Sequence, residues 1–177
     1  MHRLFVAIRP PAPIRDLLID TMEGLDAARW HGEDQLHLTL RFIGEVETPL
    51  ANDLAAALGQ VSGEPFDLAL EGVGTFDKRG RVHTLWAGLA ASPELLALQR
   101  KVEQACQRCG LEAEHRRFAP HITLARVNRA AGPLEPWLAT HRNLASPPWQ
   151  ASEFRLYEST LGRDGPHYEP VARYALG

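Results

Sequence analysis

The sequence predicts an α+β fold in which two related lobes surround a central cleft. The string H-x-T-L occurs twice, at residues 37–40 and 121–124, so its two histidines lie 84 residues apart. A short apolar strand precedes each copy at a similar interval, and helical and strand patterns alternate along both halves. We therefore expect a duplicated, bilobal chain with pseudo-two-fold symmetry. Two antiparallel sheets should line the cleft with helices on the outside, and residues 1–177 should form a single domain.

Each half of the chain follows the order strand, helix, strand. In the first half, residues 4–8 form an apolar strand, residues 14–22 have apolar positions at helical spacing, and residues 30–34 form a loop. The first motif strand then covers residues 35–43 and ends at Gly44. In the second half a strand covers residues 84–89, and a helix starts with Ser92 as N-cap and Pro93 as first residue. Gly110 suits the end of that helix, and the second motif strand covers residues 120–127.

The remaining segments complete this frame. Apolar residues at helical spacing predict helices over residues 49–61 and 134–141. Alternating apolar and polar residues predict strands over residues 66–71 and 153–161. Residues 162–166 are typical of a turn and precede a last edge strand over residues 168–176.

Composition narrows the class of protein. The chain is 45% hydrophobic and 23% charged, as is ordinary for a globular domain, and no apolar run is long enough to span a membrane. Its net charge of −3 argues against broad non-specific binding of nucleic acid, although recognition of a chain end needs few phosphate contacts. We expect a cytoplasmic protein with Cys106 and Cys109 as reduced thiols, since no further pair of zinc ligands accompanies them. The candidates for a basic rim are Arg3, Arg41, Arg79, Arg81, Arg116, Arg117, Arg126 and Arg129.

The two motifs combine residue types that can act on a phosphate. In a β-strand, residues two apart point to the same face, so the histidine and threonine of each copy face one side and the aliphatic residues the other. Histidine titrates near neutral pH and serves as acid or base, and a hydroxyl donates to a phosphate oxygen. The pattern predicts acid–base chemistry by His37 and His121, with Thr39 and Thr123 binding the phosphate.

Arg126 is a further candidate for phosphate binding, because a guanidinium pairs well with phosphate. It follows His121 by five residues, so a regular strand would turn it to the opposite face unless a strand end or a β-bulge intervenes. The remaining histidines have no repeated context and are predicted to be surface or turn residues. A ring at the cleft rim is expected to stack on a base, and the candidates are Phe5, Trp30, Phe42, Phe118 and Tyr168.

Several strings resemble a known family. Paired H-x-T-x motifs in a duplicated α+β chain are similar to those of the 2H phosphoesterase superfamily. The stretches around residues 3–8, 37–46 and 120–127 resemble the bacterial and archaeal RNA 2′,3′-cyclic phosphodiesterases, also called 2′-5′ RNA ligases. The segments 85–88, 157–161 and 165–168 are similar to that family as well, so the resemblance covers nearly the whole chain.

The resemblance implies a function and a division of roles. Family members hydrolyse a 2′,3′-cyclic phosphate at an RNA 3′ end to a 2′-phosphate, and some join RNA ends through a 2′-5′ linkage. It implies that His37 is the proton donor and His121 the proton acceptor, and that neither a metal nor a cofactor is needed. We expect a monomer whose partner is RNA with a cyclic phosphate end, and no membrane association.

Three alternatives remain open from the residues. The same site could act on small cyclic nucleotides instead of RNA. The protein could be a non-catalytic module that binds RNA ends, although binding alone does not require two titrating groups. A metallohydrolase with histidine ligands would lose activity in the presence of a chelator, whereas the phosphodiesterase interpretation predicts no such loss.

Overall fold

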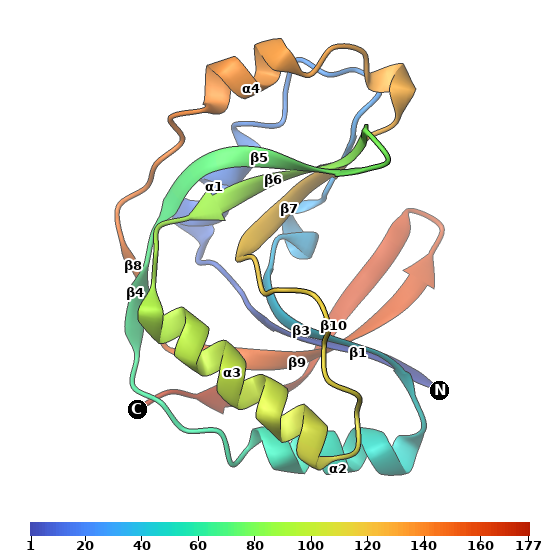
Figure 1. The fold of residues 1–177 in the computed structure, drawn as a ribbon, viewed down its shortest axis with the longest axis vertical. Helices are drawn as coiled ribbons and strands as arrows, with labels where there is room; N and C mark the ends of the chain where they lie inside the picture. Colours follow the sequence, from blue (N-terminus) through green and yellow to red (C-terminus); the bar gives the residue numbers. More distant parts are fainter.

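A computed structural model describes all residues, 1–177, and shows an α+β chain with two antiparallel sheets, one large and one small. Two lobes face each other across an open side of the molecule, and the helices lie on the outside (Figure 1). The helices are α1 (Ala12–Ile19), α2 (Thr48–Leu58), α3 (Pro93–Arg108) and α4 (Glu135–His141), with 3₁₀ turns η1 (Glu33–Gln35) and η2 (Arg129–Ala131). None of these helices is long and apolar enough to cross a membrane.

Eight of the ten strands form the large sheet. Its order is β10-β9-β1-β3-β7-β6-β5, with β2 also paired to β7, while β4 and β8 form the small sheet. The strands are β1 (His2–Ile8), β2 (Arg29–Trp30), β3 (Leu38–Val46), β4 (Phe66–Leu68), β5 (Leu70–Lys78), β6 (Arg81–Leu89), β7 (His121–Arg126), β8 (Trp149–Ala151), β9 (Glu153–Gly162) and β10 (Gly165–Ala175).

The two halves of the large sheet meet at the two motifs. Strands β3 and β7 are paired through one residue pair only, Leu38 with Ile122. Each of these residues lies between the histidine and the threonine of its motif. The sheet therefore opens into two lobes on either side of this junction, and the two H-x-T-L strings lie side by side at its centre.

The predicted duplication is visible in the order of elements. The series β1-α1-β3-α2-β4-β5 is followed by the series β6-α3-β7-α4-β8-β9, apart from the short β2 and the last strand, β10. The last strand of each series pairs with the first strand of the other, β5 with β6 and β9 with β1, and β4 pairs with β8. Because each lobe contains strands from both series, we infer that residues 1–177 fold as one domain.

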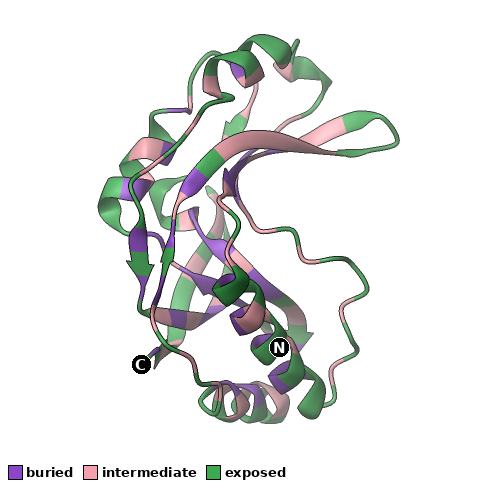
Figure 2. Ribbon diagram, turned by 60° about the vertical axis from the view of Figure 1, so that its left-hand side comes forward, coloured by how far each residue is buried: buried purple, intermediate pink, exposed green.

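Local sequence accounts for the helices, and burial accounts for the sheet. The Ser92 hydroxyl accepts a hydrogen bond from the backbone N–H of Leu95 at 3.1 Å, and Pro93 follows as the first helical residue. Gly110 has a φ of +98° just after α3, a conformation that favours glycine. One core cluster includes residues of both motifs, Leu38, Leu40, Ile122 and Leu124, all 2% exposed or less. Buried positions concentrate on the strands, and exposed ones on the outer faces of helices (Figure 2).

The sequence missed or misplaced several strand boundaries. Strand β3 starts at Leu38, one residue after His37, and continues past Gly44 to Val46. Strands β5 and β6 form a hairpin, and each is longer than the strands predicted over residues 66–71 and 84–89. The short β8 was not predicted. The predicted loop at residues 30–34 includes the end of β2 and the start of η1. The short strands β2 and β8 pair with β7 and β4, which lie far away in the chain, so local patterns carry little signal for them.

Candidate active site

Both motif strands carry a β-bulge at the same position. In β3, Thr39 faces Ala7 and Arg41 faces Val6, so Leu40 has no opposite residue. In β7, Thr123 faces Trp86 and Ala125 faces Leu85, which leaves Leu124 without one. A bulge adds one residue and reverses the alternation beyond it. The residue three after each threonine therefore returns to the face of the histidine and threonine.

The two residues that the bulges redirect are Phe42 and Arg126. Both line a cavity of about 420 Å³ in the cleft. A β-bulge, one of the two ways in which Arg126 could return to this face, is thus present in β7. The cavity is lined by Arg3, Phe5, His31, Gln35, His37, Thr39, Phe42, Thr123, Arg126, Ser159, Leu161, Pro166 and Tyr168.

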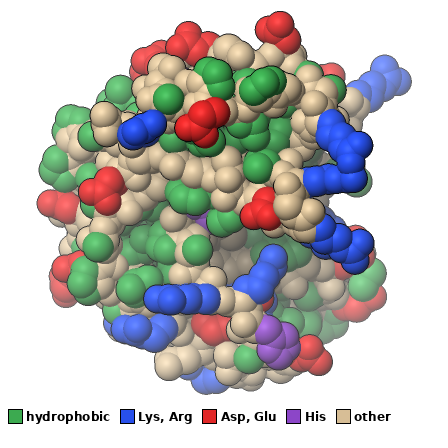
Figure 3. Space-filling model, turned by 45° about the horizontal axis from the view of Figure 1, so that its top comes forward, with side chains coloured by type: hydrophobic (Ala, Val, Ile, Leu, Met, Phe, Trp, Pro, Cys, Tyr) green, Lys and Arg blue, Asp and Glu red, His purple; other side chains and the backbone are tan.

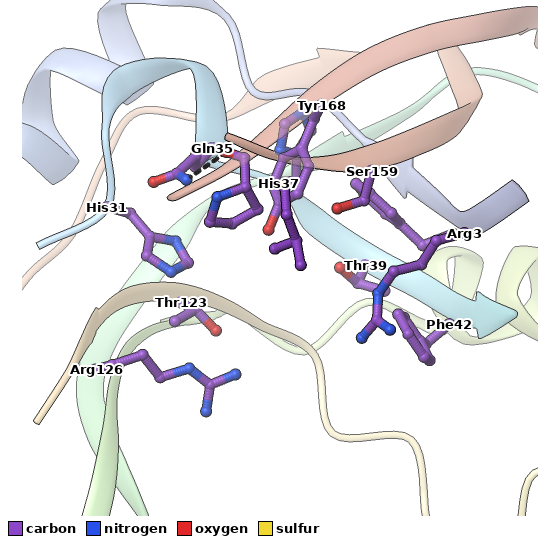
Figure 4. Close-up of a pocket in the computed structure, with 13 residues that line it drawn as sticks. Arg3, His31, Gln35, His37, Thr39, Phe42, Thr123, Arg126, Ser159 and Tyr168 are labelled. Carbon is purple, nitrogen blue, oxygen red and sulfur yellow. Dashed lines mark hydrogen bonds between the residues drawn. The ribbon is translucent and has the colours of Figure 1, made fainter. Parts of the chain in front are cut away.

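Positive charge without a carboxylate characterises this first cavity. Its lining includes two arginines, Arg3 and Arg126, and no Asp or Glu. Figure 4 shows the Arg126 guanidinium near Thr123 and the Arg3 guanidinium near Thr39 and Phe42. The ring of Phe42 lies under the Arg3 guanidinium, 5.1 Å from Cζ to the ring centroid. Such a surface is suited to an anion with several oxygens, such as a phosphate.

A second cavity of about 530 Å³ adjoins the first. It is lined by His121 but not His37, whereas the first is lined by His37 but not His121, and the two share Thr39 and Phe42. Together they form a hollow between the lobes, and lysine and arginine side chains stand along its rim (Figure 3). The fold therefore places one motif histidine on each side of a common point at Thr39.

His37 is held in an aromatic pocket. Its ring lies edge to face with Tyr157 and Phe5, at centroid distances of 4.5 and 5.9 Å. Burial lowers the pKa of His37 to about 4, and the backbone of Gln35 opposes this shift. Nδ1 of His37 is buried and has no hydrogen-bond partner within the protein. Burial thus holds His37 neutral at pH 7.

His121 has a matching environment in the other lobe. Phe76 and Trp86 flank its ring at centroid distances of 4.7 and 6.3 Å. When Nδ1 carries the proton it donates to the Ala119 carbonyl, 2.7 Å away, which leaves Nε2 as the free ring nitrogen. Burial lowers the pKa of His121, and nearby Arg126 lowers it further, while the Ala119 carbonyl raises it. A neutral His121 in this orientation can accept a proton at Nε2.

Arg126 is held in place by a neighbouring strand. Its Nη1 donates to the Thr84 hydroxyl at 2.7 Å, and Thr84 is only 2% exposed. The same hydroxyl lies 2.7 Å from Nδ1 of His83. This contact fixes one end of the guanidinium and leaves its remaining N–H groups for a ligand.

The structure corrects the prediction of a surface or turn position for two of the other histidines. His31 lines the first cavity and His83 the second. The backbone N–H of His31 donates to the Leu124 carbonyl at 2.7 Å, just after the β2–β7 pairing. Burial lowers the pKa of His31 to about 4, Arg126 adds to this shift, and its Nδ1 is buried without a partner. A single histidine outside any repeat gave no sequence signal for this placement.

The other candidates divide between the two cavities and the rest of the fold. Of the aromatic candidates, Phe5 and Tyr168 line the first cavity, Phe118 the second and Phe42 both, whereas Trp30 lines neither and packs against the core. No group of three or more His, Cys, Asp or Glu side chains is arranged to hold a metal ion. Both cysteines are unpaired, and burial raises the pKa of the Cys106 thiol to about 11, so this thiol is unreactive at neutral pH.

Comparisons of the sequence and of the fold with known proteins point to the same family. The family model of the 2′-5′ RNA ligase superfamily matches residues 10–163. The RNA 2′,3′-cyclic phosphodiesterase of Escherichia coli is 34% identical, and the match covers 99% of this chain and 97% of that protein. The protein of the same name from Geobacillus stearothermophilus is 33% identical over 89% of this chain, which spans about half the length of that relative (50%). The crystal structure of E. coli LigT complexed with 3′-AMP has a TM-score of 0.80 and 30% identity, covering 99% of this chain and 98% of that chain.

Proposed function

Since this chain belongs to the 2′-5′ RNA ligase superfamily, we propose that it hydrolyses the 2′,3′-cyclic phosphate at an RNA 3′ end to a 2′-phosphate. We further propose that it joins RNA ends through a 2′-5′ linkage when a 5′-hydroxyl replaces water. The observation that carries this proposal is the pair of imidazoles in adjoining cavities that meet at Thr39, beside two arginines and no carboxylate in the first cavity. Relatives named RNA 2′,3′-cyclic phosphodiesterase support the substrate.

The proposed reaction divides two proton transfers between the two histidines. Nε2 of His121 takes a proton from water as its oxygen attacks phosphorus. The bond from phosphorus to O3′ breaks, His37 gives a proton to O3′, and the phosphate stays on O2′. Thr39, Thr123 and Arg126 donate to the non-bridging oxygens, whose negative charge grows in the transition state. Each positioned proton transfer is typically worth about 10²- to 10⁴-fold in rate.

The negative charge of the bound phosphate favours the protonated form of His37. In the protein alone the pKa of His37 is about 4, so the ring is neutral at pH 7. A phosphate anion about 4 Å away at an effective dielectric constant of about 20 favours the imidazolium by about 4 kcal/mol. That energy raises the pKa of His37 well above its value of about 4 in the protein alone, so the ring can carry a proton near neutral pH. His37 therefore becomes a proton donor when the anion is bound.

Location and assembly belong to the same proposal. We propose that the protein acts in the cytoplasm as a monomer and needs no metal. Two unpaired cysteines fit a reducing compartment. The chelator arm of the experiment below tests the metal independence.

The decisive experiment is incubation with an RNA oligomer that ends in a 2′,3′-cyclic phosphate, in the presence of EDTA. The proposal expects full turnover and a 2′-phosphate product; a 3′-phosphate or loss of activity with EDTA would contradict it. Parallel reactions with a 2′,3′-cyclic mononucleotide separate an RNA enzyme from one for small nucleotides. Binding of the RNA without turnover would identify a recognition module instead.

Substitution of the two histidines tests their roles in the same assay. His37→Ala and His121→Ala are each expected to cut turnover by roughly 10²-fold or more, with a much smaller loss of binding. His115→Ala is the matched control, because this exposed histidine lines neither cavity. Near-full activity of either motif variant would refute the role assigned to that residue.

A further inference from the structure

We propose that the cavity beside His121 is the binding site for the 5′-terminal nucleoside of a second RNA strand, with its free 5′-hydroxyl as the nucleophile. The inference rests on the proposed function and adds the position of the acceptor and the residues that would hold it. It follows from the size, charge and lining of this cavity.

The order of bond changes assigns each strand to one cavity. In the joining reaction, the 5′-oxygen forms the bond to phosphorus, its proton passes to His121, the bond from phosphorus to O3′ breaks, and His37 protonates O3′. The nucleophile must therefore arrive from the side of His121. The nucleotide that carries the cyclic phosphate lies on the side of His37, in the first cavity. The phosphorus lies between them, where Thr39 and Phe42 line both cavities.

The second cavity is far larger than hydrolysis requires. Its volume is about 530 Å³, whereas one water occupies about 30 Å³ in the liquid. Binding sites for small molecules have volumes of about 300–1,000 Å³. The cavity on the nucleophile side can therefore hold a nucleoside as well as a water.

The charge of the two cavities differs in the way that the reaction requires. The first has two arginines and no carboxylate, as a phosphate needs. The second has equal numbers of basic and acidic side chains: Arg41, Arg116 and Arg117 against Asp77, Glu103 and Glu114. Arg41 is fully engaged, because it donates to the Glu103 carboxylate at 2.7 Å and to the Glu112 carbonyl at 2.6 Å. This balance suits an uncharged nucleoside with a free 5′-hydroxyl better than a phosphorylated end.

Aromatic rings provide the surface on which a base could stack. Phe118 lies on the segment 111–120 that runs from α3 to β7 (Figure 1), and it is half-buried with one side facing the cavity. Across the cavity, Phe76 of β5 lies against the His121 ring, so a base near it would place its ribose close to the acceptor nitrogen. Stacking on an aromatic side chain is typically worth about 1–3 kcal/mol per base and tolerates different bases. The site is therefore expected to accept any 5′-terminal nucleoside.

The test measures how the enzyme partitions one substrate between two nucleophiles. The protein is mixed with cyclic-phosphate-ended RNA and increasing adenosine, and the 2′-phosphate and the 2′-5′ adenosine adduct are quantified in the same reaction. With a binding site, adduct formation saturates with adenosine and exceeds that with ethanol at least tenfold at equal hydroxyl concentration. The 5′-deoxy analogue of adenosine gives no adduct at its 5′ position. If hydrolysis proceeds but adduct formation rises linearly with adenosine and stays at the level seen with ethanol, the binding site is refuted. The proposed hydrolysis of the cyclic phosphate is then unaffected.

Substitution of Phe118 locates the site. Phe118→Ala is expected to lower the adduct-to-hydrolysis ratio at least fivefold, and Phe118→Tyr to retain it. Because both products come from one reaction, a general loss of activity cancels in the ratio. Leu96→Ala, at an exposed position on α3, is the control. Saturation that Phe118→Ala leaves unchanged would refute this cavity as the site. If that variant does not fold, Phe118→Leu keeps an apolar side chain without the ring, and an unchanged ratio in that variant would refute the cavity in the same way.

Discussion

Two histidines in the first cavity, the buried His37 and the half-buried His31, should make the protein sensitive to acid. Burial lowers the pKa of His31 and of His37 from 6.5 to about 4, and neighbouring arginines add to the shift in both. An unfolded chain restores the value near 6.5, so it binds more protons than the folded chain between pH 6.5 and 4. The stabilising contribution is therefore complete above pH 6.5 and is lost as pH falls through this window.

The expected size of this effect follows from the two pKa values. A full shift of each histidine from 6.5 to about 4 corresponds to about 3 kcal/mol at 1.36 kcal/mol per unit. At pH 5, partial titration makes the loss about 2 kcal/mol for each histidine, or about 4 kcal/mol for both. That loss is a large part of the total stability of a typical domain, about 5–15 kcal/mol.

Urea unfolding followed by tryptophan fluorescence can measure this difference at pH 7 and pH 5. The His31→Gln and His37→Gln variants keep a polar side chain but remove the titration, and the double variant removes both. Each single variant should lose about 2 kcal/mol less than the unmodified protein between the two pH values, and the double variant about 4 kcal/mol less. Carboxylate titrations are common to all four proteins and cancel. Equal losses in all four would refute the reasoning that burial holds these rings neutral.

Three further substitutions test contacts around the site. Thr84→Val removes the hydrogen bond that holds Arg126. In steady-state kinetics we expect KM for the cyclic phosphate to rise about tenfold, which is equivalent to about 1.4 kcal/mol. An unchanged KM would mean that the contact does not orient the guanidinium. Gly74→Ala places a Cβ 2.3 Å from the Trp86 ring, which flanks His121. Turnover should therefore fall even where the melting temperature changes little. A fall in melting temperature without a fall in turnover would contradict this expectation. Arg41→Met leaves the Glu103 carboxylate, whose side chain is only 15% exposed, without a counter-charge. The free energy of unfolding in urea should fall by about 3 kcal/mol, and a loss below about 1 kcal/mol would show that the pair is solvated.

Local patterns were enough to select four side chains that the structure brings together in the cleft. His37 and His121 stand in a repeated string, and their side chains line adjoining cavities as the repeat predicts. The same is true of Thr39 and Thr123, which line the first cavity with His37. The cap at Ser92 was also predictable, because it depends on residues within one turn of the helix.

Residues that depend on strand pairing were harder to predict. The face of Arg126 depends on the bulge at Leu124, which arises in the pairing of β6 with β7. His31 reaches the cavity because β2 adds to the edge of β7, far along the chain. Neither pairing leaves a periodic pattern in its own segment. The sequence therefore left the face of Arg126 undecided, and its prediction of a surface or turn position for His31 was wrong.

The sequence by itself determined the α+β class, the duplication and the four motif side chains that face one side, because these follow from periodicity and repetition within short segments. The tertiary structure alone decided how the two copies differ and what surrounds them. The Leu38–Ile122 pair joins the motif strands, and the paired bulges bring Phe42 and Arg126 into the cleft. The physical reason is that strand register and burial are set by contacts between distant segments, and those contacts also set the pKa of each histidine.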